Sequence, residues 1–148
     1  MSEGQPRVTL RQQQDFQFEI DFGADVPKLL GDEHPPLGQG KGPTPVQLLA
    51  AAVGNCLSDS LLFALRKFKQ APEPITCEVT ATIGRNEQGR LRVQRFDVQL
   101  TLGVPAAQLQ HLDRVLDQFE AFCTVASSVS QSIPLAITVR DATGQQLK

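Results

Sequence analysis

Two cysteines, Cys56 and Cys123, are the residues of this chain best suited to redox chemistry. Cys56 lies in a small polar break inside an otherwise apolar stretch. The break consists of Gly54, Asn55, Ser58, Asp59 and Ser60. Cys123 closes an apolar stripe and is followed by small side chains. A thiol is nucleophilic as its thiolate, whereas free cysteines are commonly small core residues. The residues alone therefore leave two interpretations open, a reactive pair or two inert buried thiols.

Local sequence predicts different surroundings for the three cysteines. Cys56 is expected in the middle of a helix with Asp59 one turn further on, so local sequence offers no group that would stabilise a thiolate. Cys123 is expected at the start of a short helix, and the N-terminus of that helix would favour its thiolate. Cys77 falls on the apolar phase of a strand and is predicted to be a core residue.

Other kinds of site find little support in the sequence. The three cysteines and two histidines show no CxxC or HxxxH spacing, so we expect no metal site. His34 stands beside two prolines as a loop residue, and His111 falls on the polar side of a predicted helix. The glycines of Gly38–Gly42 do not follow a predicted strand, as a phosphate-binding loop would require. No cofactor is expected.

A long helix over Thr44–Phe68 must position Cys56. Thr44 is a good N-cap, Pro45 suits the first helical position, and Gln47 completes a capping box. The residues that follow are apolar on nearly every side, which predicts a helix buried over most of its surface. The polar break around Cys56 makes it a poor membrane span.

The residues before this helix predict two strands and a loop. Apolar residues alternate from Arg7 to Phe22 with a turn at Gln12–Asp15, which predicts a β-hairpin. Gly23–Gly42 contains several prolines and glycines, so we expect an irregular loop there. Loops of that length often line sites.

After the helix, the pattern predicts a second hairpin, a second helix and a last strand. Ile75–Ile83 alternates, and the returning strand Leu91–Leu102 shifts its apolar phase near Gln94, which predicts a β-bulge. An amphipathic helix is expected from Pro105 to Cys123, and Leu135–Val139 is the last strand. The order ββ-α-ββ-α-β with antiparallel sheets is an α+β fold, expected as a single domain over residues 1–148.

Composition narrows the functional classes. The chain has 148 residues, 41% of them hydrophobic and 20% charged, with a net charge of −2. This balance is ordinary for a soluble globular protein, and the absence of a basic block argues against nucleic acid or a membrane as partner. Three unpaired cysteines and no secretory leader predict a cytoplasmic protein without structural disulfides.

Two segments resemble the OsmC/Ohr family. Gly42–Cys56 resembles the signature GPxPxxLLxAAxxxC, and Phe122–Val125 with Ser127, Ser128 and Ile133-Pro134 resembles the segment of the family's second cysteine. The predicted order of elements is similar too. The resemblance implies an intertwined homodimer whose long helices pack centrally and whose sites lie at the subunit interface.

The resemblance also implies an activity, the thiol-dependent reduction of organic hydroperoxides. By this analogy Cys56 is the peroxidatic cysteine, which becomes a sulfenic acid. Cys123 resolves it as an intramolecular disulfide, and a dithiol donor then reduces that disulfide. The chain departs from the family at Val46, where peroxidase members carry a glutamate that works with an arginine. Only Arg7 and Arg11 precede Cys56, so the implied peroxidase is a weak one.

Two other functions remain compatible with the sequence. One is a non-catalytic protein that binds a small apolar ligand in the same interface pocket. The other is a stress-related structural dimer whose buried thiols are inert. Turnover of peroxide with a dithiol donor distinguishes the first expectation from both alternatives.

Overall fold

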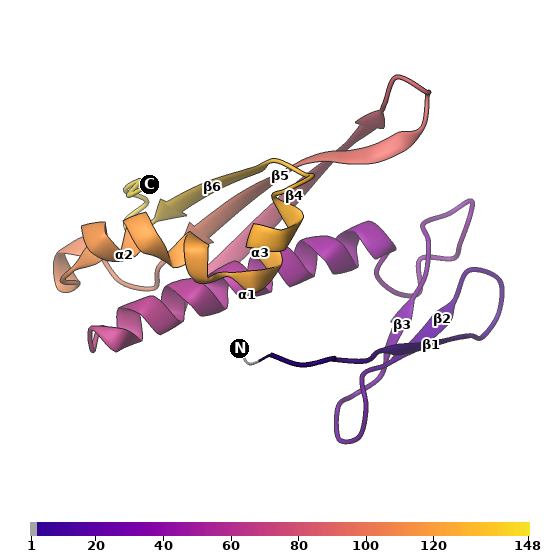
Figure 1. The fold of residues 1–148 in the computed structure, drawn as a ribbon, viewed down its shortest axis with the longest axis horizontal. Coiled ribbons are helices and arrows are strands. Elements are labelled where there is room, and N and C mark those ends of the chain that lie inside the picture. Colours follow the sequence, from indigo (N-terminus) through magenta and orange to yellow (C-terminus); the bar gives the residue numbers. More distant parts are fainter. Residues whose placement is uncertain (1–2) are drawn as a thin grey trace. The chain divides into compact units, whose positions relative to one another are not determined.

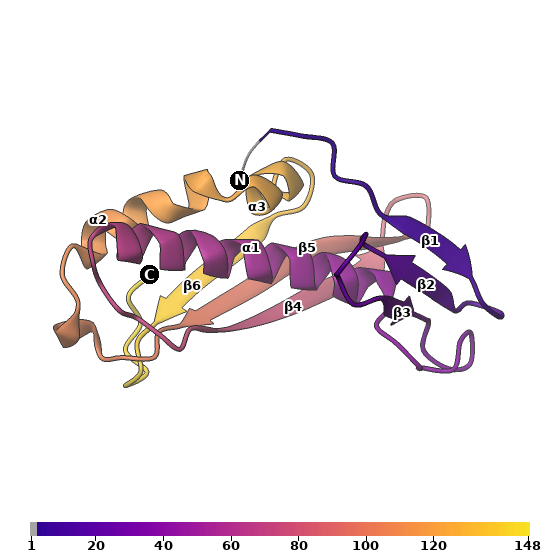
Figure 2. The same cartoon turned by 90° about the horizontal axis from the view of Figure 1, so that it is seen from below.

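The computed structural model describes residues 3–148. The chain forms two compact units, one that ends at Leu49 and one that runs from Ala50 to Lys148. Each unit is described by itself, and Figures 1 and 2 label the elements of both.

The first unit holds a three-stranded antiparallel sheet. Its strands are β1 (Thr9–Gln12), β2 (Phe18–Asp21) and β3 (Leu29–Gly31), in the order β1-β2-β3. The pairing of β1 with β2 confirms the predicted hairpin. Asp15 takes a positive φ of 48° in its turn.

The prediction of an irregular loop over Gly23–Gly42 is wrong at β3. Ile20 pairs with Leu29 and Phe18 pairs with Gly31, so the middle of this stretch adds a third strand to the hairpin. Three residues are too few to show the alternation that identifies a strand from sequence. The stretch is therefore a strand with a turn on each side.

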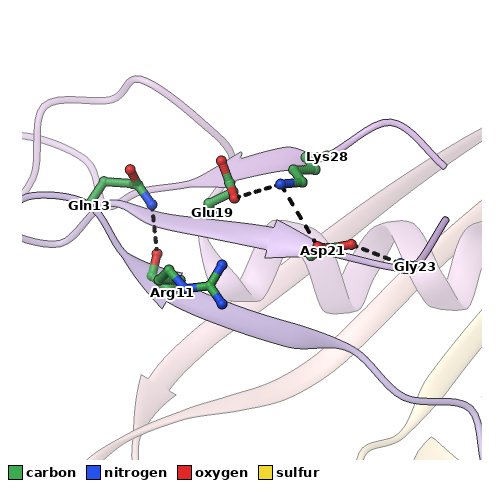
Figure 3. A network of polar contacts seen from close by, with 6 residues as sticks. All are labelled: Arg11, Gln13, Glu19, Asp21, Gly23 and Lys28. Carbon is green, nitrogen blue, oxygen red and sulfur yellow. Dashed lines mark hydrogen bonds and ion pairs between the residues drawn. The ribbon is translucent and has the colours of Figure 1, made fainter. Parts of the chain in front are cut away.

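Ion pairs and hydrogen bonds of side chains stabilise the first unit, on its exposed surface and in the turn after β3. The Lys28 ammonium lies 3.2 Å from a Glu19 carboxylate oxygen and 3.9 Å from one of Asp21 (Figure 3). The buried Asp32 carboxylate accepts N–H groups from Glu33 at 2.7 Å and Lys41 at 3.0 Å. Backbone N–H donation, from Lys41 foremost, lowers the Asp32 pKa. Exposed ion pairs contribute little to stability, so the hydrogen bonds of Asp32 contribute more to the stability of the first unit than the Lys28 ion pairs do.

The second unit is built on a mixed three-stranded sheet. Strands β4 (Thr76–Arg85) and β5 (Leu91–Thr101) form an antiparallel hairpin, and β6 (Leu135–Arg140) pairs parallel with β5. The prediction of purely antiparallel sheets is therefore wrong for β6. The long helical connection after β5 returns the chain to the same end of the sheet, as a parallel pairing requires. Gln94 is the extra residue of a bulge opposite Thr82 and Ile83, which confirms the predicted phase shift.

Helix α1 (Pro45–Lys67) begins as the sequence predicts. The Thr44 hydroxyl accepts the Gln47 N–H at 3.2 Å, and the Gln47 side chain accepts the Thr44 N–H at 2.9 Å, which completes the capping box. From Ala50 onward α1 lies along one face of the β4-β5-β6 sheet, on the same side as the later helices (Figures 1 and 2).

The second predicted helix, Pro105–Cys123, is broken into three short pieces. They are η1 (Ala106–Gln108), α2 (Leu112–Gln118) and η2 (Phe119–Phe122). His111 interrupts the helix with a positive φ of 60°. Cys123 has an extended backbone and begins α3 (Thr124–Val129), which confirms the short helix predicted there. The spacing of apolar residues predicts which side chains are buried, but it does not predict where single residues leave the helical conformation. The continuous helix was therefore a wrong prediction, although the C-terminal part of its apolar stripe is buried.

The core of the second unit lies between α1, the sheet and the short helices. Its fully buried side chains include Val53, Leu57, Leu61, Leu65, Phe96, Val98, Leu100, Leu102, Val115, Phe119 and Val139. The opposite side of α1 is not covered within this unit, since Phe63 is 71% exposed and Ala51 and Ala52 are exposed as well. The prediction of burial all round α1 is therefore wrong for the single chain.

Among residues 3–148, α1 is also the one helix long and apolar enough to cross a bilayer by length and composition. Buried residues make up 39% of its most apolar window. The central helix of a globular core passes the same test, so the finding has little weight.

Candidate functional site

Helix α1 places Cys56 on its buried side. The side chain is 4% exposed, between Val53 and Leu57, which are fully buried. These apolar neighbours follow the helical spacing that packs one face of α1 into the core. The Cys56 sulfur is therefore held by core packing rather than by a loop.

A break in the helical chain places Cys123. Its backbone is extended, with φ −86° and ψ 104°, and it serves as the N-cap of α3. The sulfur accepts the Ala126 N–H at 3.4 Å, as a capping side chain does. Cys123 is completely buried.

The fold brings these two cysteines together, although they lie far apart in the sequence. Cys56 lies close enough to Cys123 to raise its pKa, and Ser60 lies close enough to lower it. Both cysteines are free thiols. Cys56 and Ser60 are four residues apart and so share one side of α1.

Burial decides the protonation of Cys123. It raises the Cys123 pKa well above the ordinary thiol value, and the hydrogen bond and charge of Cys56 raise it further. The Ala126 N–H and the Ser60 hydroxyl act in the opposite direction, but they do not compensate for burial. The predicted effect of the helix start is present, because the Ala126 N–H lowers the Cys123 pKa, but desolvation outweighs it.

Ser60 is a residue that the sequence interpretation assigned no role. The sequence analysis named Ser60 only as one of the residues of the polar break around Cys56. Its spacing of four residues from Cys56 was the available signal, because that spacing places two side chains on one helix face. The partner of that face, Cys123, could not be read from the spacing.

Cys77 does not join the pair. It is exposed, so the prediction of a core residue is wrong. It lies on β4, an edge strand whose face towards α1 is only partly covered. There it adjoins Gly54, since a Cβ built on Gly54 would come within 3.2 Å of the Cys77 sulfur. Partial burial raises the Cys77 pKa, and the Ser58 hydroxyl opposes this effect.

The residues expected to support Cys56 show no activating arrangement within their own unit. Val46 lies in the first turn of α1, which carries no acidic residue. Arg11 takes part in the contacts of Figure 3 through its carbonyl oxygen, which accepts from the Gln13 side chain at 3.3 Å. Within residues 3–148, no cationic side chain acts on the Cys123 sulfur.

The histidines and carboxylates do not assemble a metal site in the part of the chain that the structure describes. His34 lies in the turn after β3, where its carbonyl oxygen accepts the Gly38 N–H at 3.0 Å. His111 is exposed, as expected from its polar side of the predicted helix, and its ring stacks on Phe68 at 4.8 Å between centroids.

An apolar cavity of about 220 Å³ lies wholly within the first unit. Its walls are Leu10, Phe16, Phe18, Ile20, Gly31, Asp32, Glu33, Pro43, Pro45 and Leu48. Phe16 and Phe18 are 46% and 39% exposed. The cavity could hold a small apolar molecule, but neither Cys56 nor Cys123 contributes to its walls.

Comparison with solved structures identifies relatives of the whole fold. A Psychrobacter arcticus protein, assigned to an osmotic stress induced and detoxification response, superimposes with a TM-score of 0.76 at 19% identity, covering 93% of this chain and 98% of that one. A Vibrio cholerae protein, assigned to organic hydroperoxide resistance and holding captopril in one of its active sites, gives 0.69 at 18% identity, with 95% and 94% coverage. An organic hydroperoxide resistance protein from Elizabethkingia anophelis gives 0.72 at 15% identity, with 95% and 99% coverage.

At these identities the solved structures establish the fold alone. No functionally curated protein matches the sequence. The family model for OsmC-like proteins matches residues 38–138, which include α1 with Cys56 and the segment of Cys123. The chain therefore belongs to the family of OsmC-like proteins.

Proposed function

We propose that this protein is a peroxidase that reduces organic hydroperoxides with two cysteines and a dithiol donor. The observation that carries the proposal is that Cys56 and Cys123 are both buried and lie close enough together for Cys56 to raise the pKa of Cys123. Two relatives of the fold bear the name of organic hydroperoxide resistance proteins. The reaction needs neither metal nor cofactor, because sulfur supplies both electrons.

Cys56 is the peroxidatic residue. Cys123 keeps its proton because burial and the neighbouring Cys56 raise its pKa, so we assign the attacking thiolate to Cys56. The Cys56 thiolate attacks the terminal oxygen of the hydroperoxide, the one that carries hydrogen; an S–O bond forms and the O–O bond breaks. The alkoxide leaves as the alcohol after taking up a proton, and Cys56 becomes a sulfenic acid.

Cys123 is the resolving residue. When Cys56 becomes a neutral sulfenic acid, the charge that raised the Cys123 pKa is gone, so Cys123 ionises more readily. The Cys123 thiolate attacks the Cys56 sulfur, the S–S bond forms, and hydroxide leaves as water after protonation. A dithiol donor then reduces the disulfide to two thiols and becomes a disulfide itself.

The functional molecule is a homodimer in this proposal. Phe63 on α1 and Phe122 before Cys123 are each 71% exposed, and α1 exposes further apolar residues along its uncovered side. Apolar surface of this extent commonly marks a protein interface, and a second copy would cover it. The three free thiols and the need for a dithiol reductant suit a reducing compartment such as the cytoplasm.

The test is a peroxide-consumption assay with cumene hydroperoxide and a small dithiol. We expect continuous turnover by the wild type and none by Cys56→Ser. With one equivalent of peroxide and no donor, Cys56 and Cys123 should disappear as free thiols while Cys77 remains titratable. Loss of Cys77 before the other two, or no consumption at all, would refute the proposal.

A second function is favoured by Val46 and by the apolar cavity of the first unit. A valine accepts no hydrogen bond, so it cannot orient an arginine as a carboxylate can. This favours a protein that binds a small apolar ligand without turning it over. Val46→Glu distinguishes the two, because a peroxidase that lacks only its carboxylate should become faster with organic hydroperoxides. An unchanged or lower rate in a folded Val46→Glu protein would favour the binding protein.

A further inference from the structure

The residues that follow β6 turn back along that strand and bring Lys148 against α2 and η2. The Leu147 N–H donates to the Val139 carbonyl oxygen at 2.7 Å, and the Val139 N–H donates to the Lys148 carbonyl oxygen at 3.0 Å. These two bonds fix the backbone of Lys148 to the edge of the sheet. Its side chain can therefore hold another element in place.

The Lys148 side chain binds the segment that leads to Cys123. Its ammonium donates to the Leu116 carbonyl oxygen at 2.7 Å and to the Glu120 carboxylate, and it lies 5.4 Å from the centre of the fully buried Phe119 ring. Leu116 belongs to the last turn of α2, where the helix dipole favours a cation. The Lys148 side chain is 33% exposed, so water screens these contacts less than it screens an ion pair on the open surface.

Glu120 connects this ammonium to Cys123. The Glu120 carbonyl oxygen accepts the Cys123 N–H at 3.1 Å and the Ser127 hydroxyl at 3.3 Å, so one residue is bonded to both sides of the break between η2 and α3. The backbone leaves the helical conformation at Cys123. The position of Cys123 therefore depends on these contacts of η2 rather than on a continuous helix.

We propose that Lys148 is a positioning residue for disulfide formation, whose ammonium fixes α2 and η2 and thereby holds Cys123 beside Cys56. The inference rests on the proposed peroxidase function and deepens it. In the step concerned, the Cys123 thiolate attacks the sulfur of the Cys56 sulfenic acid, the S–S bond forms and the S–O bond breaks. The departing hydroxide takes up a proton and leaves as water. Lys148 acts through the backbone and keeps its own protons, because groups held in a fixed geometry react faster than groups that move freely.

Single-turnover kinetics separate this role from a general effect on stability. Reduced protein is mixed with one equivalent of cumene hydroperoxide, the sulfenic acid is trapped with dimedone, and disulfide formation is followed in parallel. Lys148→Met keeps an unbranched side chain but removes its charge and its donors. It should leave the formation of sulfenic acid within about twofold of the wild-type rate and slow the disulfide step about fivefold, because Cys123 is held less firmly.

Two matched variants and a change of salt serve as controls. Lys148→Arg keeps a cation with several donors and should restore the disulfide step to within about twofold of the wild-type rate. Arg95→Met removes an exposed ion pair with Asp97 in the same unit, and it should leave both steps unchanged. Raising the salt concentration from about 0.1 M to about 1 M should slow the disulfide step of the wild type but not that of Lys148→Met, because salt screens partly exposed charges.

Thiol labelling tests the restraint without peroxide. In a Cys56→Ser/Cys77→Ser background, Cys123 is the one remaining thiol. Because Cys123 is completely buried, its rate of labelling by Ellman's reagent reports the local opening of its segment. Adding Lys148→Met should raise that rate about fivefold, whereas adding Arg95→Met should not change it. Urea denaturation checks that the opening is local.

The experiments fail in different ways. A wild type that forms no sulfenic acid refutes the peroxidase, whereas an unchanged disulfide rate or an unchanged labelling rate in the Lys148→Met protein refutes the role of Lys148. Equal slowing of both chemical steps by Lys148→Met would show a general disturbance of the core and would also overturn the inference.

Discussion

The two sides of α1 differ in the residues that they place near a cysteine sulfur from another element. On one side Cys56 and Ser60 meet Cys123, a completely buried residue at the break between η2 and α3. On the other side Gly54 and Ser58 meet Cys77, an exposed residue on the edge strand β4. Both sulfurs lie near a serine hydroxyl, and burial raises the pKa of both thiols.

This comparison shows that a serine and a perturbed pKa do not make a redox site. What distinguishes the first side is a second thiol within reach, since a disulfide requires two cysteines with closely spaced α-carbons. On the second side the α1 residue that adjoins the Cys77 sulfur is Gly54, which has no sulfur to form a disulfide. The proposed chemistry therefore follows from Cys56 and Cys123 facing each other, and Cys77 is a reference thiol in the same unit.

Replacing the thiols one at a time gives the largest expected difference between the two sides. Cys56→Ser should lower the rate of peroxide reduction by at least about a thousandfold, because the attacking atom is lost. Cys77→Ser should leave the rate within about twofold of the wild type. The measurement is steady-state consumption of cumene hydroperoxide with a dithiol donor.

Cys123→Ser separates nucleophile from resolver within the first side. It should oxidise once and then accumulate a sulfenic acid on Cys56 that dimedone traps. If Cys77→Ser proved as damaging as Cys56→Ser, the contrast between the two sides would be lost and the roles of the thiols would have to be reassigned.

The pH dependence of disulfide formation comes next in size. Burial and Cys56 raise the Cys123 pKa, so at neutral pH the thiol form predominates and the thiolate fraction rises about tenfold per pH unit. Disulfide formation in single turnover should rise towards that slope between about pH 6 and pH 8. Because oxidation of Cys56 removes one cause of the raised pKa, the rate should level off below the pH at which Cys123 ionises in the reduced protein. A rate that falls with pH would contradict the assignment of Cys123 as resolver.

Much of the fold could be predicted because it is encoded locally. The Thr44–Gln47 capping box, the first hairpin and the bulge at Gln94 depend on residues a few positions apart, and the structure contains all three. The features that could not be predicted depend on distant partners. The parallel pairing of β6 and the exposure of Cys77 on an edge strand are decided by which strands become neighbours.

The candidate site shows the same division. The sequence drew attention to Cys56 and Cys123 and predicted a short helix at Cys123. It did not predict that Cys123 would leave the helical conformation, nor that burial would outweigh the helix start in its pKa. The proximity of Ser60 to Cys123 could not be predicted, because it depends on Cys123 packing near the same face of α1.

Gly54→Ala tests the close approach of α1 to β4 on the second side. The new Cβ would lie 2.7 Å from a Val79 methyl carbon and 3.2 Å from the Cys77 sulfur. Overpacking of this kind costs about 1–3 kcal/mol, whereas replacing a helical glycine by alanine stabilises by about 1 kcal/mol. We therefore expect a net loss of roughly 1 kcal/mol in the free energy of unfolding, measured by urea denaturation. The exposed Asn55→Ala is the control, and a gain in stability for Gly54→Ala would show that β4 yields at little cost.

The smallest expected effect concerns Ser58 on the second side of α1. The Ser58 hydroxyl lowers the Cys77 pKa, yet its single proton already serves the Gly54 carbonyl oxygen at 2.7 Å. It must give up that bond to stabilise a Cys77 thiolate, so the net gain is small. In a Cys56→Ser/Cys123→Ser background, Ser58→Ala should raise the thiolate midpoint of Cys77 by no more than about half a pH unit. A larger shift would mean that the Ser58 hydroxyl gives up its bond to Gly54 at little cost, and competition between the two acceptors would not limit its effect on Cys77.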